Sequence, residues 1–291
     1  MKQSARSRIA ALTRGPQSAF EEDIIAAGKR FRGVMKWICL AFVVWLSLTY
    51  AASDASAQDE DIFAQPVLGF IPKPGWPPQG PVPRLADGKP DLSGPWAPNA
   101  LRINNNTSSA VKDIPLQPWA AELLKLRRAN IGKDDPEGFC LPPGVPRTNT
   151  TPFPFRIVQS AGLIVIIYEG GAHLWRQIFM DGRPHPKDPN PTWLGDSLGR
   201  WEGDTLVVDS VGFNGKSWID AAGLPTTESL HVIERFRRID RGYLEIEHTI
   251  DDPKAYTKPW TFTIHPMLLD GELMEYICQE NNADIQHLVG R

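Results

Sequence analysis

The sequence predicts an all-β protein whose antiparallel meander closes into a calycin-like β-barrel of about eight or nine strands. Short runs rich in β-branched and aromatic residues follow one another after residue 154. Turns that contain glycine separate several of these runs, and such turns join neighbouring strands as hairpins. A β-sandwich is the alternative, but sandwiches commonly use long crossing connections, which this succession of hairpins lacks.

Residues 1–57 are expected to be a signal peptide with an upstream extension, and Met1 and Met35 are both candidate starts. Basic residues between positions 29 and 36 precede an apolar block at 37–50, which Ala55, Ser56 and Ala57 follow. This order is typical of a secretory signal, and the block is short for a membrane span, although an uncleaved anchor is the alternative. We therefore expect a periplasmic or secreted protein that has no membrane contact after cleavage behind Ala57.

The composition of the remaining chain excludes some kinds of partner. Without residues 1–57, 23 basic residues (31 minus 8) face 30 acidic ones (34 minus 4), a net charge of −7. An acidic chain without a basic cluster is not typical of nucleic-acid-binding proteins, so we expect no nucleic-acid partner. Cys140 and Cys278 are the cysteines that remain. In an oxidising compartment this pair favours a disulfide over a metal site or a nucleophile.

Residues 58–98 are expected to form a Pro-rich extended arm, and residues 99–291 a single barrel domain. Ten prolines lie between positions 66 and 98, and proline lacks the N–H donor that a regular helix or sheet requires. One helix is predicted near residues 118–130. Pro118 suits a first helical position, apolar residues recur at helical spacing after it, and Gly132 ends the pattern.

The barrel domain is expected to contain nine strands, at 155–160, 163–169, 173–181, 197–202, 205–213, 230–240, 243–251, 260–267 and 272–280. Glycines at positions 162, 171, 203, 242 and 271 lie between successive runs. Glycine adopts the positive φ that tight hairpin turns require. The runs are therefore expected to pair in chain order.

Three of these strands each carry one ionisable residue on an otherwise apolar face. The period-2 alternation of side chains identifies them as Arg176, Glu234 and His248. If they line a cavity, His248 is a candidate general base, Glu234 a group that orients it, and Arg176 a group that holds a substrate anion. The alternative is structural, an Arg176–Glu234 ion pair to which His248 is hydrogen-bonded, because buried charges usually occur paired.

Further candidates for ligand contact are aromatic or lie at a loop rim. Trp201, Tyr256 and Trp260 are candidates for stacking on a ligand, although aromatic residues more often belong to the core. Asp181 and His185 are candidates at a loop rim, although Asp-Gly and His-Pro steps are first of all turn and loop signals. The six histidines lack the spacing of a metal site, so neither a metal nor a cofactor is expected.

Several long sequence blocks resemble those of a large family of secreted bacterial proteins. They are RQIFMDGRPHP at 176–186, GRWEGDTLVVD at 199–209, LHVIERF at 230–236 and DDPKAYTKPW at 251–260. The similarity covers roughly residues 85–291 and includes CLPPGVPR at 140–147 and CQEN at 278–281. This resemblance implies secretion and an all-β core, and it implies no particular activity.

Two functions of different class remain. The first is a barrel that binds a small hydrophobic or aromatic molecule in its interior, which is favoured because barrel interiors offer apolar pockets. The second is a cofactor-free lyase, isomerase or hydrolase that uses Arg176, Glu234 and His248 in the same cavity. The chain contains no Gly-x-Ser-x-Gly, His-Glu-x-x-His, dinucleotide-binding or phosphate-loop motif, which disfavours the commonest enzyme classes.

Overall fold

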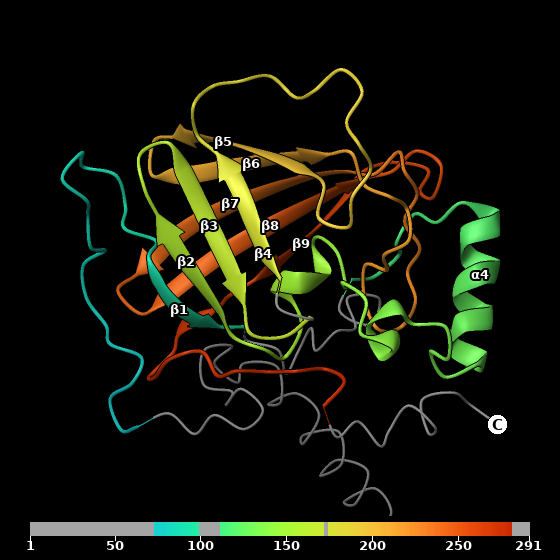
Figure 1. The fold of residues 1–291 in the computed structure, drawn as a ribbon, viewed down its shortest axis with the longest axis horizontal. Coiled ribbons are helices and arrows are strands. Elements are labelled where there is room, and N and C mark those ends of the chain that lie inside the picture. Colours follow the sequence, from blue (N-terminus) through green and yellow to red (C-terminus); the bar gives the residue numbers. More distant parts are fainter. Residues whose placement is uncertain (1–72, 99–110, 172–173, 281–291) are drawn as a thin grey trace, which may run out of the picture. The chain divides into compact units, whose positions relative to one another are not determined.

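A closed β-barrel of nine strands forms the centre of the structure (Figure 1). This computed structural model describes residues 73–98, 111–171 and 174–280, all of which fall within one compact unit, residues 63–291. The strands are β1 (Gly94–Ala97), β2 (Phe155–Gln159), β3 (Leu163–Tyr168), β4 (Trp175–Phe179), β5 (Asp196–Glu202), β6 (Thr205–Val211), β7 (His231–Asp240), β8 (Tyr243–Asp251), β9 (Trp260–Ile264) and β10 (Met267–Leu268). The predicted signal peptide, residues 1–57, and residue 173 of the third predicted strand lie outside the described residues.

The barrel closes because β10 pairs with strands from both ends of the sheet. Strands β1 to β9 pair in chain order, and Trp96 of β1 lies opposite Leu268 of β10. On its other side, Met267 of β10 lies opposite Tyr243 of β8. β9 precedes β10 along the same strand β8, so the two occupy one position in the ring. The prediction of an all-β barrel of eight or nine strands is confirmed.

One junction of the barrel departs from the predicted antiparallel meander. β4 and β5 are parallel, and within these described strands they share a single register pair, Phe179 with Leu198. The connection at 180–195 loops back instead of turning as a hairpin, and it carries prolines at 184, 186, 189 and 191. We call the junction the seam and define it as residues 174–179 and 192–198. A parallel pair with one register contact is a weak place in an otherwise continuous ladder.

Two further expectations about strands were wrong. Residues 94–97, assigned to the arm, form β1, and Trp96 is fully buried with its indole N–H donated to the Leu92 carbonyl at 3.0 Å. Residues 272–280, predicted as a strand, form no regular structure. Instead, the backbone N–H of Met274 donates to the Glu169 carboxylate, and Cys278 forms a disulfide with Cys140. The disulfide prediction is confirmed.

The predicted helix is α4 (Pro118–Ala129), the one α-helix among the described residues. Ala120 and Leu124 are its buried residues. The indole of Trp119 donates to the Lys254 carbonyl at 2.7 Å, and the Arg127 guanidinium lies 4.3 Å from the centre of the Trp218 ring. The helix thus packs against loops of the barrel. Among the parts of the chain that the structure describes, no helix has the length and apolarity to cross a membrane.

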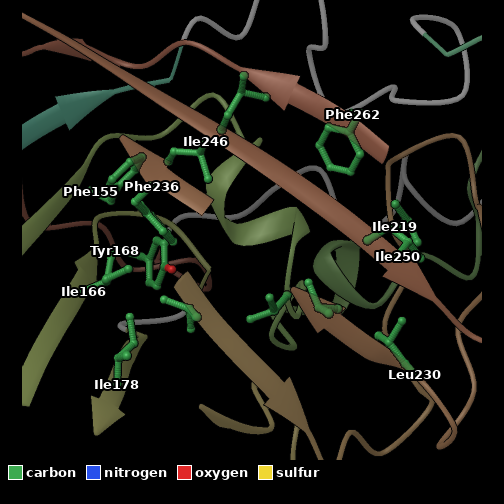
Figure 2. Close-up of a cluster of buried hydrophobic side chains, with 14 of the residues drawn as sticks. Phe155, Ile166, Tyr168, Ile178, Ile219, Leu230, Phe236, Ile246, Ile250 and Phe262 are labelled. Carbon is green, nitrogen blue, oxygen red and sulfur yellow. The ribbon is translucent and has the colours of Figure 1, made fainter. Parts of the chain in front are cut away.

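Alternation along each strand builds the core inside the barrel (Figure 2). In β8 the inward residues Leu244, Ile246 and Ile250 are fully buried, whereas their neighbours reach the surface. Ile178 of β4 and Phe236 of β7 face the same interior. Burial of each such side chain contributes roughly 1.5–3 kcal/mol, so a shift of register by one residue is strongly disfavoured.

The described part of the arm crosses one end of the barrel, where the β5–β6 and β7–β8 turns lie (Figure 1). Arg84 forms an ion pair with Asp204, and the backbone N–H of Gly80 donates to Asp240 at 3.1 Å. The 3₁₀ helices η1 (Pro136–Phe139) and η2 (Arg147–Asn149) belong to the segment between α4 and β2. This segment reaches the barrel interior from the other side. It carries Asn149, whose side chain contacts Glu234 and Tyr168 inside the barrel.

Candidate functional site

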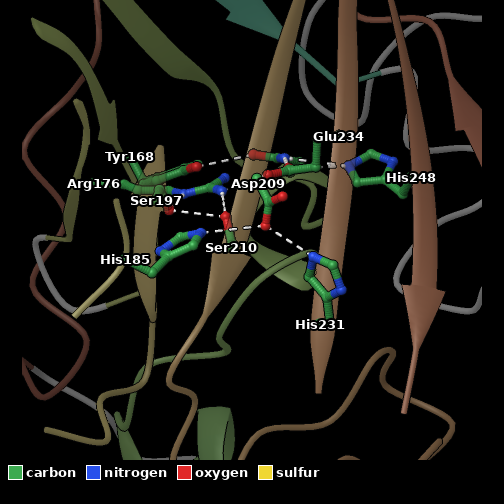
Figure 3. A network of polar contacts seen from close by, with 10 residues as sticks. Tyr168, Arg176, His185, Ser197, Asp209, Ser210, His231, Glu234 and His248 are labelled. Atoms are coloured by element: carbon green, nitrogen blue, oxygen red, sulfur yellow. Dashed lines mark hydrogen bonds and ion pairs between the residues drawn. The ribbon is translucent and has the colours of Figure 1, made fainter. Parts of the chain in front are cut away.

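Arg176, Glu234 and His248 meet inside the barrel, as the alternation pattern predicts (Figure 3). They come from β4, β7 and β8, and the side chains are 1%, 0% and 0% exposed. Arg176 Nη2 forms an ion pair with Glu234 Oε2, and the other carboxylate oxygen lies 3.5 Å from His248 Nε2. Glu234 and His248 are directly opposite in the β7–β8 register, which explains their proximity.

Two serines contact the Arg176 guanidinium, whose Nη1 is buried without a hydrogen-bond partner among the described residues. Arg176 Nε donates to Ser197 Oγ at 3.0 Å, and Nη2 donates to Ser210 Oγ at 2.8 Å. The two hydroxyl oxygens lie 3.0 Å apart, and both side chains are buried. Ser197 belongs to β5, so its bond to Arg176 crosses the seam. The sequence contained a signal for these serines, because each is the inward neighbour of an outward-facing aspartate, but it was missed.

Asn149 is the central residue that sequence reasoning missed. Its amide nitrogen donates to Glu234 Oε1 at 2.6 Å, and its carbonyl oxygen accepts from the Tyr168 hydroxyl at 2.9 Å. The same nitrogen lies 3.2 Å from His248 Nε2. A neutral imidazole with its proton on Nδ1 accepts this second bond. Asn149 therefore joins the carboxylate, the imidazole and the phenol into one network.

A buried segment holds Asn149 in place. The nine residues 143–151 are all buried, although five of them are polar. Arg147, next to the asparagine, forms ion pairs with Asp135 at 2.7 Å and Glu137 at 2.6 Å. Arg147 itself is 1% exposed, so these two carboxylates are needed to stabilise its charge. The segment thus closes the barrel on the side of Asn149.

Burial governs the charges of this network. Desolvation lowers the pKa of His248 to about 4, with a partial offset from the Glu234 carboxylate. Burial opposes ionisation of Arg176, but the Glu234 carboxylate and the Tyr168 hydroxyl together outweigh it, and the pKa of Arg176 lies above its ordinary value. Burial raises the pKa of Tyr168. At neutral pH the network therefore contains one ion pair, a neutral imidazole and a neutral phenol.

The lowered pKa of His248 predicts a loss of stability in mild acid. Below pH 6.5 the unfolded chain protonates this ring, whereas the folded protein does so only near pH 4. The contribution is complete above pH 6.5 and is lost as the pH falls towards 4, by about 3 kcal/mol in total. Urea unfolding at pH 7, 6 and 5 should show a steeper fall for the wild type than for His248→Gln. Parallel pH profiles of the two proteins would contradict this assignment.

The geometry of the network favours a structural role. Glu234 accepts bonds from Arg176 and Asn149, and His248 stacks on Phe262 with ring centres 4.6 Å apart. A general base needs a free nitrogen directed at a substrate. Nε2 of His248 faces Asn149, and Nδ1 has no hydrogen-bond partner among the described residues but is buried and lines neither of the two pockets described below. The catalytic role of the three residues thus stays a hypothesis without geometric support, while the structural alternative accounts for each contact.

A second polar cluster lies on the outer face of the same strands (Figure 3). His185, in the connection at 180–195, has Nδ1 2.6 Å from Asp196 Oδ1 and Nε2 3.3 Å from Asp209 Oδ1. His231 Nε2 lies 2.8 Å from the same oxygen of Asp209. Through these contacts the cluster holds the 180–195 connection against β5 and β6. His185, predicted at a loop rim, is therefore half-buried beside the seam.

A pocket of about 610 Å³ lies along the seam, on the side where β4 and β5 diverge. Its polar lining includes Arg176, Ser197 and Asp196. Gly195, which precedes Asp196 in the lining, has a φ of 69°. A Cβ at this position would lie 2.6 Å from the Val211 carbonyl oxygen, so only glycine fits. Six apolar residues form the remaining walls: Pro142, Leu174, Trp175, Phe179, Trp193 and Leu194.

A second pocket, of about 630 Å³, lies on the other side of the Phe179–Leu198 pair, next to the arm. Trp201, a predicted ligand contact, lines it together with Lys89 and Gln159. The Lys89 ammonium lies 5.8 Å from the centre of the Trp201 ring, so a cation of the protein already occupies one side of this aromatic surface. The two pockets flank the one register pair that joins β4 to β5.

The remaining predicted contacts line neither pocket. Tyr256 and Trp260 are 1% and 7% exposed and pack edge to face in the core, with the Tyr256 hydroxyl donated to the Pro225 carbonyl at 2.9 Å. Asp181 is exposed and forms an ion pair with Arg183. For these three positions, the structure agrees with the core and turn alternatives that the sequence left open.

Comparisons with known proteins found no match: no family model, no curated protein and no solved structure corresponds to this chain. Within the described ranges, no group of three or more His, Cys, Asp or Glu side chains has a geometry that could hold a metal ion. The pocket at the seam is therefore the feature from which we infer a function.

Proposed function

We propose that this protein binds a small hydrophobic or aromatic molecule in the pocket at the seam. The observation that carries the proposal is the pocket itself, whose volume of about 610 Å³ falls within the range typical of small-molecule sites. Three aromatic side chains and three aliphatic ones line it, together with a few polar groups. Such a combination supplies binding energy from apolar contact and orientation from the polar groups.

The exposure of Trp175 supports this proposal. Its side chain is 57% exposed on β4, which is unusual for so large an apolar group, and it borders the pocket. A ligand that covered this indole would gain the free energy of burying its surface. Arg176 and Ser197, which point inward, link the pocket to the barrel interior.

We also propose that the protein acts in the periplasm or outside the cell and belongs to the family of secreted bacterial proteins that its sequence blocks resemble. The order of charged, apolar and small residues in positions 29–57 supports export. The Cys140–Cys278 disulfide is consistent with an oxidising compartment.

A neutral fluorescent probe tests binding at the seam. N-phenyl-1-naphthylamine should bind saturably to the wild type, and Trp175→Ala should weaken binding about tenfold, because the probe loses a stacking partner. Trp119→Ala is the matched control, since Trp119 is a similarly exposed indole on α4, outside the pocket. Absence of saturable binding, or equal effects of the two substitutions, would refute the proposal.

A further inference from the structure

We infer that the ligand of the seam pocket is an organic cation, an amine carried on an apolar or aromatic body. This inference deepens the proposed function and depends on it. It rests on the aromatic walls of the pocket, on the carboxylate of Asp196 in the same wall, and on the neutralisation of Arg176 by Glu234.

The aromatic walls suit a cation. Trp175, Phe179 and Trp193 line the pocket, and the faces of such rings attract ammonium and guanidinium groups. One face of Phe179 is already occupied by the Arg183 guanidinium, which lies 4.0 Å from its ring centre, so the two tryptophans are the rings that remain for a ligand cation. Tryptophan is the strongest partner for a cation among the aromatic residues, and two tryptophans border this pocket.

The wall of the pocket contains one carboxylate, Asp196. Asp196 Oδ1 lies 2.6 Å from His185 Nδ1, and the side chain is 24% exposed towards solvent. The other ring nitrogen of His185, Nε2, lies 3.3 Å from Asp209 Oδ1, and His231 Nε2 lies 2.8 Å from the same oxygen. Asp196 thus shares the His185 imidazole with a second carboxylate. Even a protonated His185 would leave one negative charge in excess between these two carboxylates.

Arg176, the cationic residue in the pocket lining, is not accessible to an anionic ligand. Its side chain is 1% exposed and already forms an ion pair with Glu234, itself fully buried. The Nη1 atom of Arg176 has no hydrogen-bond partner among the described residues, but this atom is buried as well. An anion in the pocket would compete with Glu234 and would lie near Asp196. A cation meets neither difficulty, because an ammonium group near Asp196 would restore charge balance there. The apolar body of the ligand would then contact Leu174 and Leu194.

Three probes of matched shape separate the charge preference from the binding function. Naphthylmethylamine, naphthalenemethanol and naphthylacetate carry a positive, a neutral and a negative group, and each is titrated against the N-phenyl-1-naphthylamine complex of the mature protein at pH 7.5. We expect the amine to bind about fivefold more tightly than the alcohol, and the carboxylate most weakly. Added salt should reduce the advantage of the amine, since salt screens exposed charges.

The variant Asp196→Asn tests whether the charge of Asp196 is responsible for the preference for the amine. The substitution keeps the shape and an acceptor for His185, so it should reduce amine affinity to that of the alcohol and leave alcohol affinity unchanged. Asp204→Asn, in the β5–β6 turn, is the matched control and should leave all three affinities unchanged. Thermal melts verify folding, and the three-probe comparison on the wild type needs no variant.

The outcomes distinguish the two proposals. Equal affinities for the amine and the alcohol, or tighter binding of the carboxylate, overturn the inference and leave the seam pocket as a binding site. Failure of all three probes to displace N-phenyl-1-naphthylamine refutes the location at the seam. Failure of N-phenyl-1-naphthylamine itself to bind refutes the proposed function.

Discussion

Glu234→Ala is expected to lower the free energy of unfolding by about 3–5 kcal/mol, because the substitution removes the carboxylate that forms an ion pair with the buried Arg176. Asn149 would also lose the acceptor of its shortest side-chain bond. Urea or guanidinium unfolding of the purified variant measures the loss. A stable Glu234→Ala protein that had lost ligand binding would instead assign these groups to a functional site.

A control and a rescue variant make this test specific. Glu202→Ala removes an exposed carboxylate that pairs with Arg235, and such surface pairs contribute little. The double variant Arg176→Met, Glu234→Leu removes both charges together and should recover most of the stability, since apolar residues of similar volume often replace a buried ion pair without loss. If the double variant is no more stable than Glu234→Ala, the unpaired charge is not the cause of the loss.

Removal of the disulfide is expected to cost about 3–5 kcal/mol. Cys140 and Cys278 are separated by 138 positions, and a cross-link over so long a loop restricts the unfolded chain strongly. The double variant Cys140→Ser, Cys278→Ser should unfold at correspondingly lower denaturant concentration. Its stability should be insensitive to a reducing agent, whereas that of the wild type should fall when the agent is added. Two free thiols in the denatured, unreduced wild type would show that the bond is absent in solution.

The strands and their order could be predicted because local signals agree with the fold. In β7 and β8 the buried, inward positions are apolar except for Glu234, Arg238 and His248, and glycine at position 242 marks the turn between the strands. The same alternation placed Arg176 inside. Helix α4 was predictable for an equivalent reason, since Pro118 marks its first position.

Tertiary contacts hid the other features from sequence reasoning. The parallel seam follows from the path of the 180–195 connection, which His185 fastens to Asp196 and Asp209, and no local pattern specifies that path. The polar run at 147–151 is typical of an exposed loop, yet Asn149 is buried because Glu234, His248 and Tyr168 accept or donate its bonds. A pocket between strands that diverge is likewise a property of the assembled barrel.

The two residues of β10 also determine when the barrel can close during folding. Tyr243 of β8 lies close to β10 along the chain, whereas Trp96 of β1 is far from it, so the β1–β10 pair that closes the ring is among the contacts most distant in sequence. Contacts of this kind form slowly, because a long loop must be ordered before they stabilise it. A chain that folds while it is synthesised from the N-terminus therefore forms an open sheet first. The edges of this sheet at β1 and at the strand made last stay unpaired until residues 267–268 have been synthesised. Until then both edges can pair with other chains, and a chaperone that shields strand edges would act in this interval.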